Sequence, residues 1–135
     1  MKLLLSKISI IFVFFLLVKS GNNAFAQNDT YKVSKVAIKS GSSKELAKYF
    51  YDIVEVSFDG EKASYSKAHA EIMFKDFFKK HPALSFEDVH HGSTKGGLTY
   101  AIGKYTHAKG AFRVVIYIKK IKGMEVIDTI EFSKW

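Results

Sequence analysis

The sequence between Ser66 and Pro82 predicts one helix with a broad aromatic stripe, and this stripe limits the folds that the chain can adopt. Lys67, Lys75 and Lys79 fall on the opposite side of the helical wheel. Ser66 is a residue type that caps helix N-termini, and Pro82 cannot continue the helix. The stripe is made of Ala70, Met73, Phe74, Phe77 and Phe78. Because such a stripe has to pack on an extended apolar surface, the rest of the chain must provide one.

The C-terminal third of the chain is predicted to provide this surface as a sheet. Turns that contain glycine separate its strand-like runs, which is typical of a meander of antiparallel strands. The predicted strands are Leu84 to His91, Leu98 to His107, Ala111 to Lys120 and Met124 to Lys134.

The N-terminal half predicts two short helices and a hairpin before the aromatic helix. Apolar residues recur at helical spacing from Val33 to Ser40, and a capping box begins the next helix at Ser42, with Phe50 on its apolar face. Asp59 and Gly60 then form a typical two-residue hairpin turn. Because helices and strands are segregated along the chain, the sequence predicts an α+β fold with a mostly antiparallel sheet.

Residues 1–26 have the features of a cleavable export signal. Lys2 and Lys7 form a basic start, Ile8 to Val18 an apolar run, and Ala26 ends a small-x-small cleavage pattern. The run is too short to span a bilayer, which takes roughly 20 residues. We therefore expect one mature domain, residues 27–135, that is periplasmic or secreted. The sequence contains no cysteine, which excludes disulfides and a lipid-modified cysteine.

The charge of the chain is mildly basic. Without the lysines of the export signal, the net charge falls from +8 to +5. This excess is compatible with an anionic envelope surface or an acidic glycan. The lysines are scattered rather than interleaved with aromatic residues in a stripe, so we expect no nucleic-acid partner.

The turn at residues 108–110 decides which side chains share a face of the sheet. A three-residue loop would place even-numbered residues of both strands together, so that Tyr100 and Ile102 stand beside Ile116 on the concave face. A two-residue loop would instead place Ala101 and Gly103 beside the large aliphatic residues, and the first register is preferred for that reason. The opposite face then has the mixed composition of a subunit interface, with Tyr105, Val115 and Tyr117.

Three segments carry a resemblance to a known family: "YSKAHAEIMFKDFF", "VHHGSTKGGLTYAIG" and "FRVVIYIKK". They resemble small secreted proteins of Gram-negative bacteria that share the domain of unknown function 4783. The order of elements resembles the nuclear transport factor 2-like superfamily, a cystatin-like cone in which a curved sheet wraps the third helix. The resemblance implies a pocket between that helix and the concave sheet, and a homodimer through the other face. It implies no catalytic motif.

The residues of the predicted pocket are Phe74, Phe77, Tyr100, Ile116 and Asp128. Asp128 is the one candidate for catalysis. In one register of the last hairpin it is buried on the concave face, where desolvation would raise its pKa. In the other register Ile127 faces the core and Asp128 is solvated, which avoids the cost of burying an unpaired acid.

The histidines do not have the spacing of a metal site. His90 and His91 are adjacent on a predicted strand and point to opposite faces, and His69 and His81 lie about 18 Å apart along one helix. We expect no metal and no cofactor. The sequence therefore predicts a non-catalytic domain that binds a small apolar or amphipathic ligand or an envelope partner. The alternatives are a pocket lyase or isomerase that uses Asp128, and a purely structural dimerisation domain.

Overall fold

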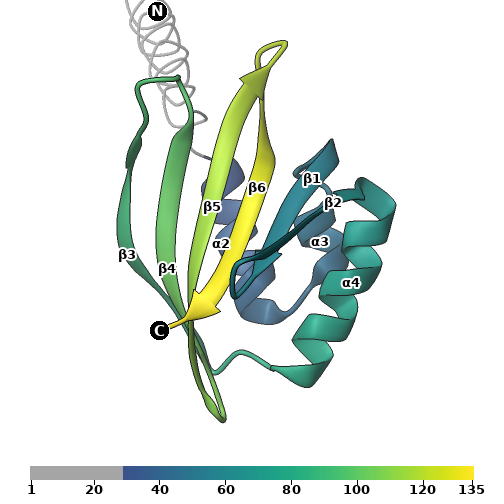
Figure 1. Cartoon of the computed structure of the whole chain (residues 1–135), viewed down its shortest axis with the longest axis vertical. Helices are drawn as coiled ribbons and strands as arrows, with labels where there is room; N and C mark the ends of the chain where they lie inside the picture. Colours follow the sequence, from purple (N-terminus) through teal and green to yellow (C-terminus); the bar gives the residue numbers. More distant parts are fainter. Residues whose placement is uncertain (1–28) are drawn as a thin grey trace, which may run out of the picture.

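A computed structural model describes residues 29–135 of the chain. The export signal predicted for residues 1–26 lies outside the described residues. The described part forms one six-stranded sheet with its helices on one side (Figure 1). The strands bend around these helices, so the concave face of the sheet becomes the wall of the core.

Three helices cover the concave face in the described part of the chain: α2 (Asp29–Ser40), α3 (Ser43–Ala47) and α4 (Lys67–Lys80). Gly41, with φ of +72°, ends α2 in the left-handed conformation that glycine adopts easily. The hydroxyl of Ser42 then accepts a hydrogen bond from the backbone N–H of Glu45 at 3.2 Å and caps α3. Ser66 caps α4 in the same way, as its sequence position predicts.

The strands occur in the sheet order β2-β1-β6-β5-β4-β3. Their bounds are β1 (Phe50–Phe58), β2 (Glu61–Ser66), β3 (Ser85–Ser93), β4 (Thr99–His107), β5 (Gly110–Ile121) and β6 (Met124–Lys134). Among the strands of residues 29–135, only β1 and β6 pair in parallel, so the predicted mostly antiparallel sheet is confirmed. Phe50 begins β1 and does not belong to the second helix, which corrects that part of the prediction.

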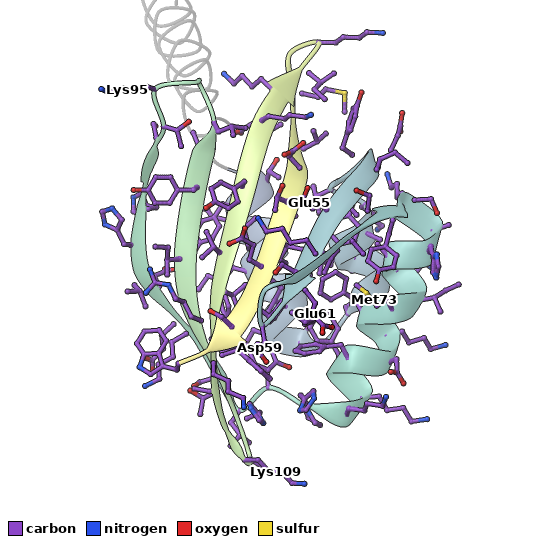
Figure 2. All side chains as sticks on the ribbon, in the orientation of Figure 1. Glu55, Asp59, Glu61, Met73, Lys95 and Lys109 are labelled. Carbon is purple, nitrogen blue, oxygen red and sulfur yellow. The ribbon has the colours of Figure 1, made fainter. Side chains whose placement is uncertain are left out.

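The aromatic stripe of α4 packs against the inside of the sheet, as predicted. Phe74 is fully buried, and its ring lies 5.7 Å from that of Phe50 on β1 and 5.8 Å from that of Phe132 on β6. Phe77 lies 4.7 Å from Phe132 between ring centroids. The side chains around α4 fill this part of the concave face (Figure 2).

The preferred register of β4 and β5 is wrong, because the turn between them has two residues. His107 pairs with Gly110, so Tyr105, Gly103 and Ala101 face the core. The physical reason is the ring of Phe86, which needs small residues opposite it on the sheet. Phe86 on β3 lies directly over Gly103, where a Cβ atom would come within 2.4 Å of the ring. The small residues of β4 therefore leave the space that an edge-strand aromatic occupies.

An extra residue in β6 decides the position of Asp128. Tyr117 pairs with Thr129 and Ile118 pairs with Ile127, which leaves Asp128 as the additional residue of a β-bulge. The bulge lets Ile127 and Ile130 both face the core, while Asp128 points outward.

Candidate functional site

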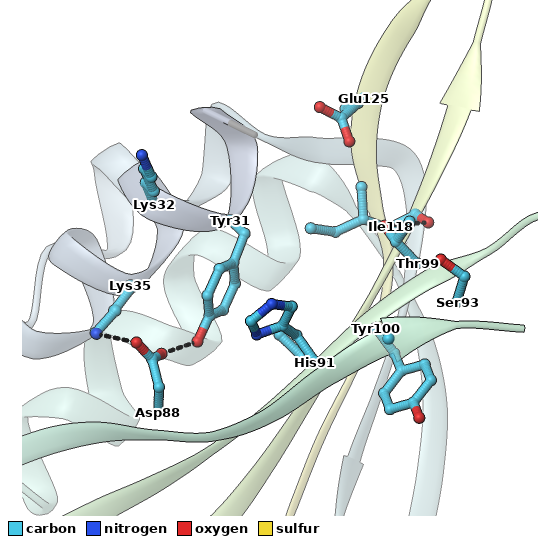
Figure 3. Close-up of a pocket in the computed structure, with 12 residues that line it drawn as sticks. Tyr31, Lys32, Lys35, Asp88, His91, Ser93, Thr99, Tyr100, Ile118 and Glu125 are labelled. Carbon is cyan, nitrogen blue, oxygen red and sulfur yellow. Dashed lines mark hydrogen bonds and ion pairs between the residues drawn. The ribbon is translucent and has the colours of Figure 1, made fainter. Parts of the chain in front are cut away.

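A cleft of about 470 Å³ opens between α2 and strands β3 to β5 (Figure 3). Its floor is apolar, formed by Ala101 and Ile118, and the ring of Tyr31 forms part of the wall on α2. The polar residues that line it are Lys32, Lys35, Asp88, His91, Ser93, Thr99 and Glu125. The cleft therefore combines an apolar floor with charged and hydroxyl groups around it, which is the composition of small-molecule sites.

A bulge in β3 brings two of these polar residues to the same face. Asp88 pairs with Gly103 and His90 pairs with Ile102, so Val89 is the additional residue. Regular alternation would place Asp88 and His91 on opposite faces of the strand. After the bulge, His91 pairs with Ala101 and faces α2 together with Asp88.

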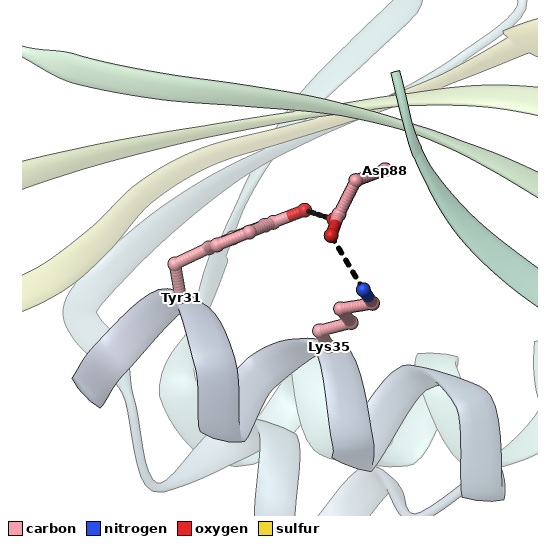
Figure 4. A network of polar contacts seen from close by, with 3 residues as sticks. All are labelled: Tyr31, Lys35 and Asp88. Atoms are coloured by element: carbon pink, nitrogen blue, oxygen red, sulfur yellow. Dashed lines mark hydrogen bonds and ion pairs between the residues drawn. The ribbon is translucent and has the colours of Figure 1, made fainter. Parts of the chain in front are cut away.

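Asp88 holds α2 to the edge strand through two contacts (Figure 4). The Tyr31 hydroxyl donates a hydrogen bond to Asp88 Oδ1, and Lys35 Nζ lies 2.6 Å from Asp88 Oδ2. Tyr31 and Lys35 are four residues apart on one face of α2, so one carboxylate can reach both. We call these three residues the α2–β3 clamp.

The contacts within the clamp shift the pKa values of Asp88 and Tyr31 in opposite directions. Hydrogen bonds from Lys35 and Tyr31 lower the pKa of Asp88 below its usual value of 3.8. Burial, followed by the hydrogen bond to Asp88, raises the pKa of the Tyr31 hydroxyl. Asp88 is thus ionised and Tyr31 protonated at neutral pH, so neither group is poised to exchange a proton with a ligand.

The structure does not place the predicted pocket residues in this cleft as a group. Phe74, Phe77 and Ile116 belong to the filled core around α4. Tyr100 adjoins the cleft, but its ring points away from it, on the outer face beside Tyr117 (Figure 3). The expected space between α4 and the sheet is therefore occupied, and the cleft lies beside the first described helix instead.

Of the three residues predicted at a subunit interface, one changes face with the corrected register. Tyr105 was expected at a subunit interface but is fully buried, and its hydroxyl donates a hydrogen bond to the backbone oxygen of His81. Burial raises the pKa of Tyr105 to about 12. Val115 and Tyr117 do lie on the outer face as predicted, where Tyr100 and Ile102 are their cross-strand neighbours.

Asp128 lies on the outer face in a salt bridge. Its Oδ1 is 2.8 Å from Lys119 Nζ, and the Thr129 hydroxyl donates to Oδ2 at 3.0 Å. The Lys119 ammonium group also lies 4.6 Å from the centroid of the Tyr51 ring. The buried, proton-transferring version of Asp128 is therefore wrong, and the solvent-facing alternative is the one that the structure shows.

The clamp residues and His91 are not among the predicted pocket residues. The spacing of Tyr31 and Lys35 is visible in the sequence, but the bulge that turns Asp88 and His91 toward them is not. Across residues 29–135, no group of three or more His, Cys, Asp or Glu side chains is placed to hold a metal ion. Over the same residues, no helix has the length and apolar character needed to cross a bilayer.

The comparison with known families identifies the chain. Residues 31–133 match the family described as domain of unknown function (DUF4783). The chain belongs to this family. A crystal structure of a DUF4783 family protein from Bacteroides ovatus is 31% identical, with a TM-score of 0.72 over 76% of this chain and 93% of that chain. The predicted family is thus confirmed.

More distant structures support the fold alone. An NTF-2 like protein of unknown function from Burkholderia xenovorans is 13% identical, with a TM-score of 0.60 over 80% of this chain and 83% of that one. A domain of unknown function with a cystatin-like fold from Nostoc punctiforme is 12% identical, with a TM-score of 0.64 over 82% and 75%. The DUF4783 chain therefore has a nuclear transport factor 2-like, cystatin-like fold. Comparison with curated proteins finds no match.

Proposed function

We propose that this DUF4783 protein is an exported, non-catalytic binding domain that takes a small amphipathic molecule into the cleft beside α2. The observation that carries the proposal is the cleft's division into an apolar floor, Ala101 and Ile118, and a polar rim. Its volume of about 470 Å³ is in the range of small-molecule sites. An apolar part of the ligand would contact the floor and the Tyr31 ring, and a polar part would contact the rim.

The chemistry of the rim supports binding over catalysis. Lys35 already neutralises Asp88, whose lowered pKa makes it a poor proton acceptor at neutral pH. Lys32 and His91 are exposed at the opening and can donate hydrogen bonds to a ligand acceptor. The alternative of a lyase or isomerase that uses Asp128 has no such support, since Asp128 faces away from the cleft in a salt bridge with Lys119.

Occlusion of the cleft by a bulky side chain tests the proposal. Thr99 is exposed and lines the cleft, so Thr99→Trp would fill it without entering the core. Ser64→Trp on the edge strand β2 is the matched control, because it adds the same ring at an exposed strand position outside the cleft. The probe is 8-anilinonaphthalene-1-sulfonate, an amphipathic anion whose fluorescence rises on binding.

We expect Thr99→Trp to weaken binding of this probe about tenfold or more, the loss of one well-placed apolar contact area. Ser64→Trp should bind it as the unsubstituted protein does. Equal binding by all three proteins, with native circular dichroism spectra, would show that the probe does not use the cleft and would overturn the assignment.

A second candidate function, self-association, is supported by the outer face of the sheet. Tyr100 and Tyr117 pair across the strands there, as do Ile102 and Val115, and all of them are half-buried. They form an apolar patch with charged residues beside it on β5 and β6, which is the arrangement of interface centres. We propose that a second copy of the chain covers this patch.

Charges beside the patch favour a two-fold arrangement. Arg113 lies two residues before Val115 on β5, and Glu131 lies opposite Val115 on β6. A two-fold axis near Val115 would bring Arg113 of one copy toward Glu131 of the other.

Light scattering should report a dimer that Tyr117→Glu dissociates and that Ser64→Glu leaves intact. A monomer at high micromolar concentration for the unsubstituted protein would exclude this candidate.

A further inference from the structure

A shallow basic groove lies at the narrow end of the sheet, beside the turn between β4 and β5 and the end of β6. Its volume is about 570 Å³. The residues that line it are Lys104, Thr106, His107, Lys109, Gly110, Ala111, Phe112, Lys134 and Trp135. Of these described residues, three are lysines and none is acidic. The cleft beside α2 differs, because Asp88 and Glu125 line it together with its lysines.

The groove lysines are not used inside the fold. None of the salt bridges in residues 29–135 involves Lys104, Lys109 or Lys134. Asp59 accepts a hydrogen bond from the backbone N–H of Lys134 at 3.0 Å, which leaves the ammonium group of Lys134 out of this contact. Three positive charges therefore remain available to an external partner.

Two histidines lie beside the lysines at this end of the sheet. His81 lies 5.2 Å from His107 between ring centroids, and its pKa is lowered. The causes are burial first, and then the charges of His107, Lys80 and Lys109. Since positive neighbours disfavour a protonated imidazole, the lowered pKa has part of its origin in the same lysine-rich surface.

Two large apolar side chains are exposed beside these lysines. Trp135 is 56% exposed and Leu84 is 70% exposed. Trp135 lines the groove. The backbone N–H of Leu84 donates to the oxygen of Thr106, another lining residue, at 2.8 Å, so Leu84 lies next to the groove at the start of β3. Lys104 Nζ lies 4.7 Å from the centroid of the Trp135 ring. The lysines and the two apolar residues thus lie at the same end of the sheet.

We propose that this surface, which we call the basic tip (Lys104, Lys109, Lys134, Leu84 and Trp135), docks the protein on an anionic phospholipid bilayer. Lysine ammonium groups are attracted to the phosphates of anionic lipids. Tryptophan favours the headgroup region, where its ring is partly buried and its N–H is hydrated, and leucine favours the acyl boundary below it. A soluble polyanion would account for the lysines but would leave the exposed Leu84 and Trp135 without a role.

The tip can contact a flat surface because its parts lie at one end of the molecule. Lys109 projects from the β4–β5 turn, and Lys95 projects from the β3–β4 turn at the opposite end (Figure 2). The C-terminal end of β6 lies toward the β4–β5 turn (Figure 1). The apposed bilayer would therefore meet this end of the sheet and leave the cleft beside α2 open.

Vesicle co-sedimentation tests the proposal on the purified protein. The probes are vesicles of phosphatidylglycerol mixed with phosphatidylcholine, vesicles of phosphatidylcholine alone, and soluble inorganic polyphosphate. The triple variant Lys104→Gln, Lys109→Gln, Lys134→Gln removes the charge of the tip. The matched control is Lys95→Gln, Lys120→Gln, Lys122→Gln, which removes the same charge at turns and strand ends away from the tip.

We expect binding to anionic vesicles that weakens as salt is added, with little binding to phosphatidylcholine alone. Each lysine near an anionic surface contributes about fivefold in affinity, so the tip variant should lose roughly 100-fold and the control variant far less. Leu84→Ser should weaken vesicle binding but leave polyphosphate binding unchanged.

The fluorescence of Trp135 gives a second, site-specific measurement, because it is the only tryptophan in the sequence. Its emission should shift to the blue on anionic vesicles as the ring leaves water. Three results would each overturn the proposal: no binding to anionic vesicles, binding without a shift of Trp135, or equal losses in the tip and control variants. Polyphosphate binding at least as tight as vesicle binding, and independent of Leu84, would identify a soluble polyanion as the partner instead.

Discussion

The two ends of the concave face differ in how completely side chains fill them. Under α4, the rings of Phe74, Phe77 and Phe132 contact one another and leave no space for a ligand. Under α2, the sheet presents Ala101 and Ile118, and a cleft remains. The same curved sheet thus supports a closed core and an open site, and the size of the facing side chains decides which forms.

Phe86 marks the boundary between the two ends. Its ring contacts Gly103 on the sheet and lies 6.5 Å from the Tyr105 ring, which belongs to the filled core. One position further along β3, the chain reaches Glu87 and then Asp88 of the α2–β3 clamp. The filled end is therefore held by apolar contacts, and the open end is held across the cleft by a polar clamp.

The largest predicted effects on stability come from truncating one side chain at each end of the concave face. Phe74→Ala should lower the free energy of unfolding by about 3–5 kcal/mol, because the surrounding rings cannot close the cavity it leaves. Ile118→Ala at the cleft floor should cost about 2 kcal/mol, the low end for an aliphatic truncation, because one side of Ile118 already adjoins open space. Urea denaturation of both variants measures the difference.

A matched pair of truncations makes this comparison sharper. Val114 is a buried residue of the same strand that, unlike the buried Ile118, does not line the cleft, and Val114→Ala removes fewer atoms. If Val114→Ala lowers the free energy of unfolding as much as Ile118→Ala or more, although it removes fewer atoms, the cleft floor is less tightly packed than the core. An Ile118→Ala loss as large as that of Phe74→Ala would mean that the two ends are equally well packed.

Much of the fold was predictable because its signals are local. The aromatic stripe from Ala70 to Phe78, the cap at Ser66 and the turn at Asp59 each specify their own element within a few residues. The glycine-containing turns divided the C-terminal third into the observed strands. The segregation of helices from strands then sufficed to predict the α+β class.

The candidate site was not predictable because it depends on register. A single extra residue in β3 turns His91 to the face of Asp88, and a single extra residue in β6 turns Asp128 out of the core. Bulges of this kind leave no local pattern that separates them from regular alternation. The sequence disfavours the two-residue turn after His107, because this turn places Ala101 and Gly103 among large residues. In the structure, Gly103 leaves room for the ring of Phe86 and Ala101 leaves room for the cleft.

An intermediate effect is expected from a change at the boundary between the ends. Gly103→Ala would place a Cβ atom 2.4 Å from Cζ of Phe86, so the ring has to move. The expected loss is about 1–3 kcal/mol in the free energy of unfolding, as for other overpacked positions. Gly96→Ala in the β3–β4 turn is the control, because its nearest neighbour lies 3.9 Å away, and it should change stability by less than about 0.5 kcal/mol.

A double variant shows whether Phe86 is the cause. In the double variant Phe86→Leu, Gly103→Ala, the added methyl group meets a smaller side chain. The losses in unfolding free energy of the two single variants should therefore sum to more than the loss of the double variant, by about 0.5 kcal/mol or more. Additive losses would indicate that Gly103 is needed for another reason, such as the twist of β4, and that Phe86 does not mark the boundary.

The smallest effect is expected from the clamp at the open end. Asp88→Asn removes the charge that Lys35 pairs with and weakens the hydrogen bond from Tyr31. Because the Asp88 side chain is 49% exposed, solvent screens the pair, and the expected loss is about 1 kcal/mol or less at neutral pH. Asp76→Asn, which breaks the exposed pair with Lys80 on α4, is the control and should cost about 0.5 kcal/mol or less.

The pH dependence of this loss separates the two ends most directly. The pKa of Asp88 is lower in the folded protein than its usual value of 3.8, so the ionised form is favoured by folding. Its stabilising contribution is therefore complete above the unfolded-state pKa and disappears as the pH falls through the lower folded-state pKa. The difference between Asp88→Asn and the unsubstituted protein should shrink over that acidic range, whereas the cost of Phe74→Ala should stay constant because no charge is involved. If the Asp88→Asn difference stays constant as well, the carboxylate charge is not what holds α2 over the cleft.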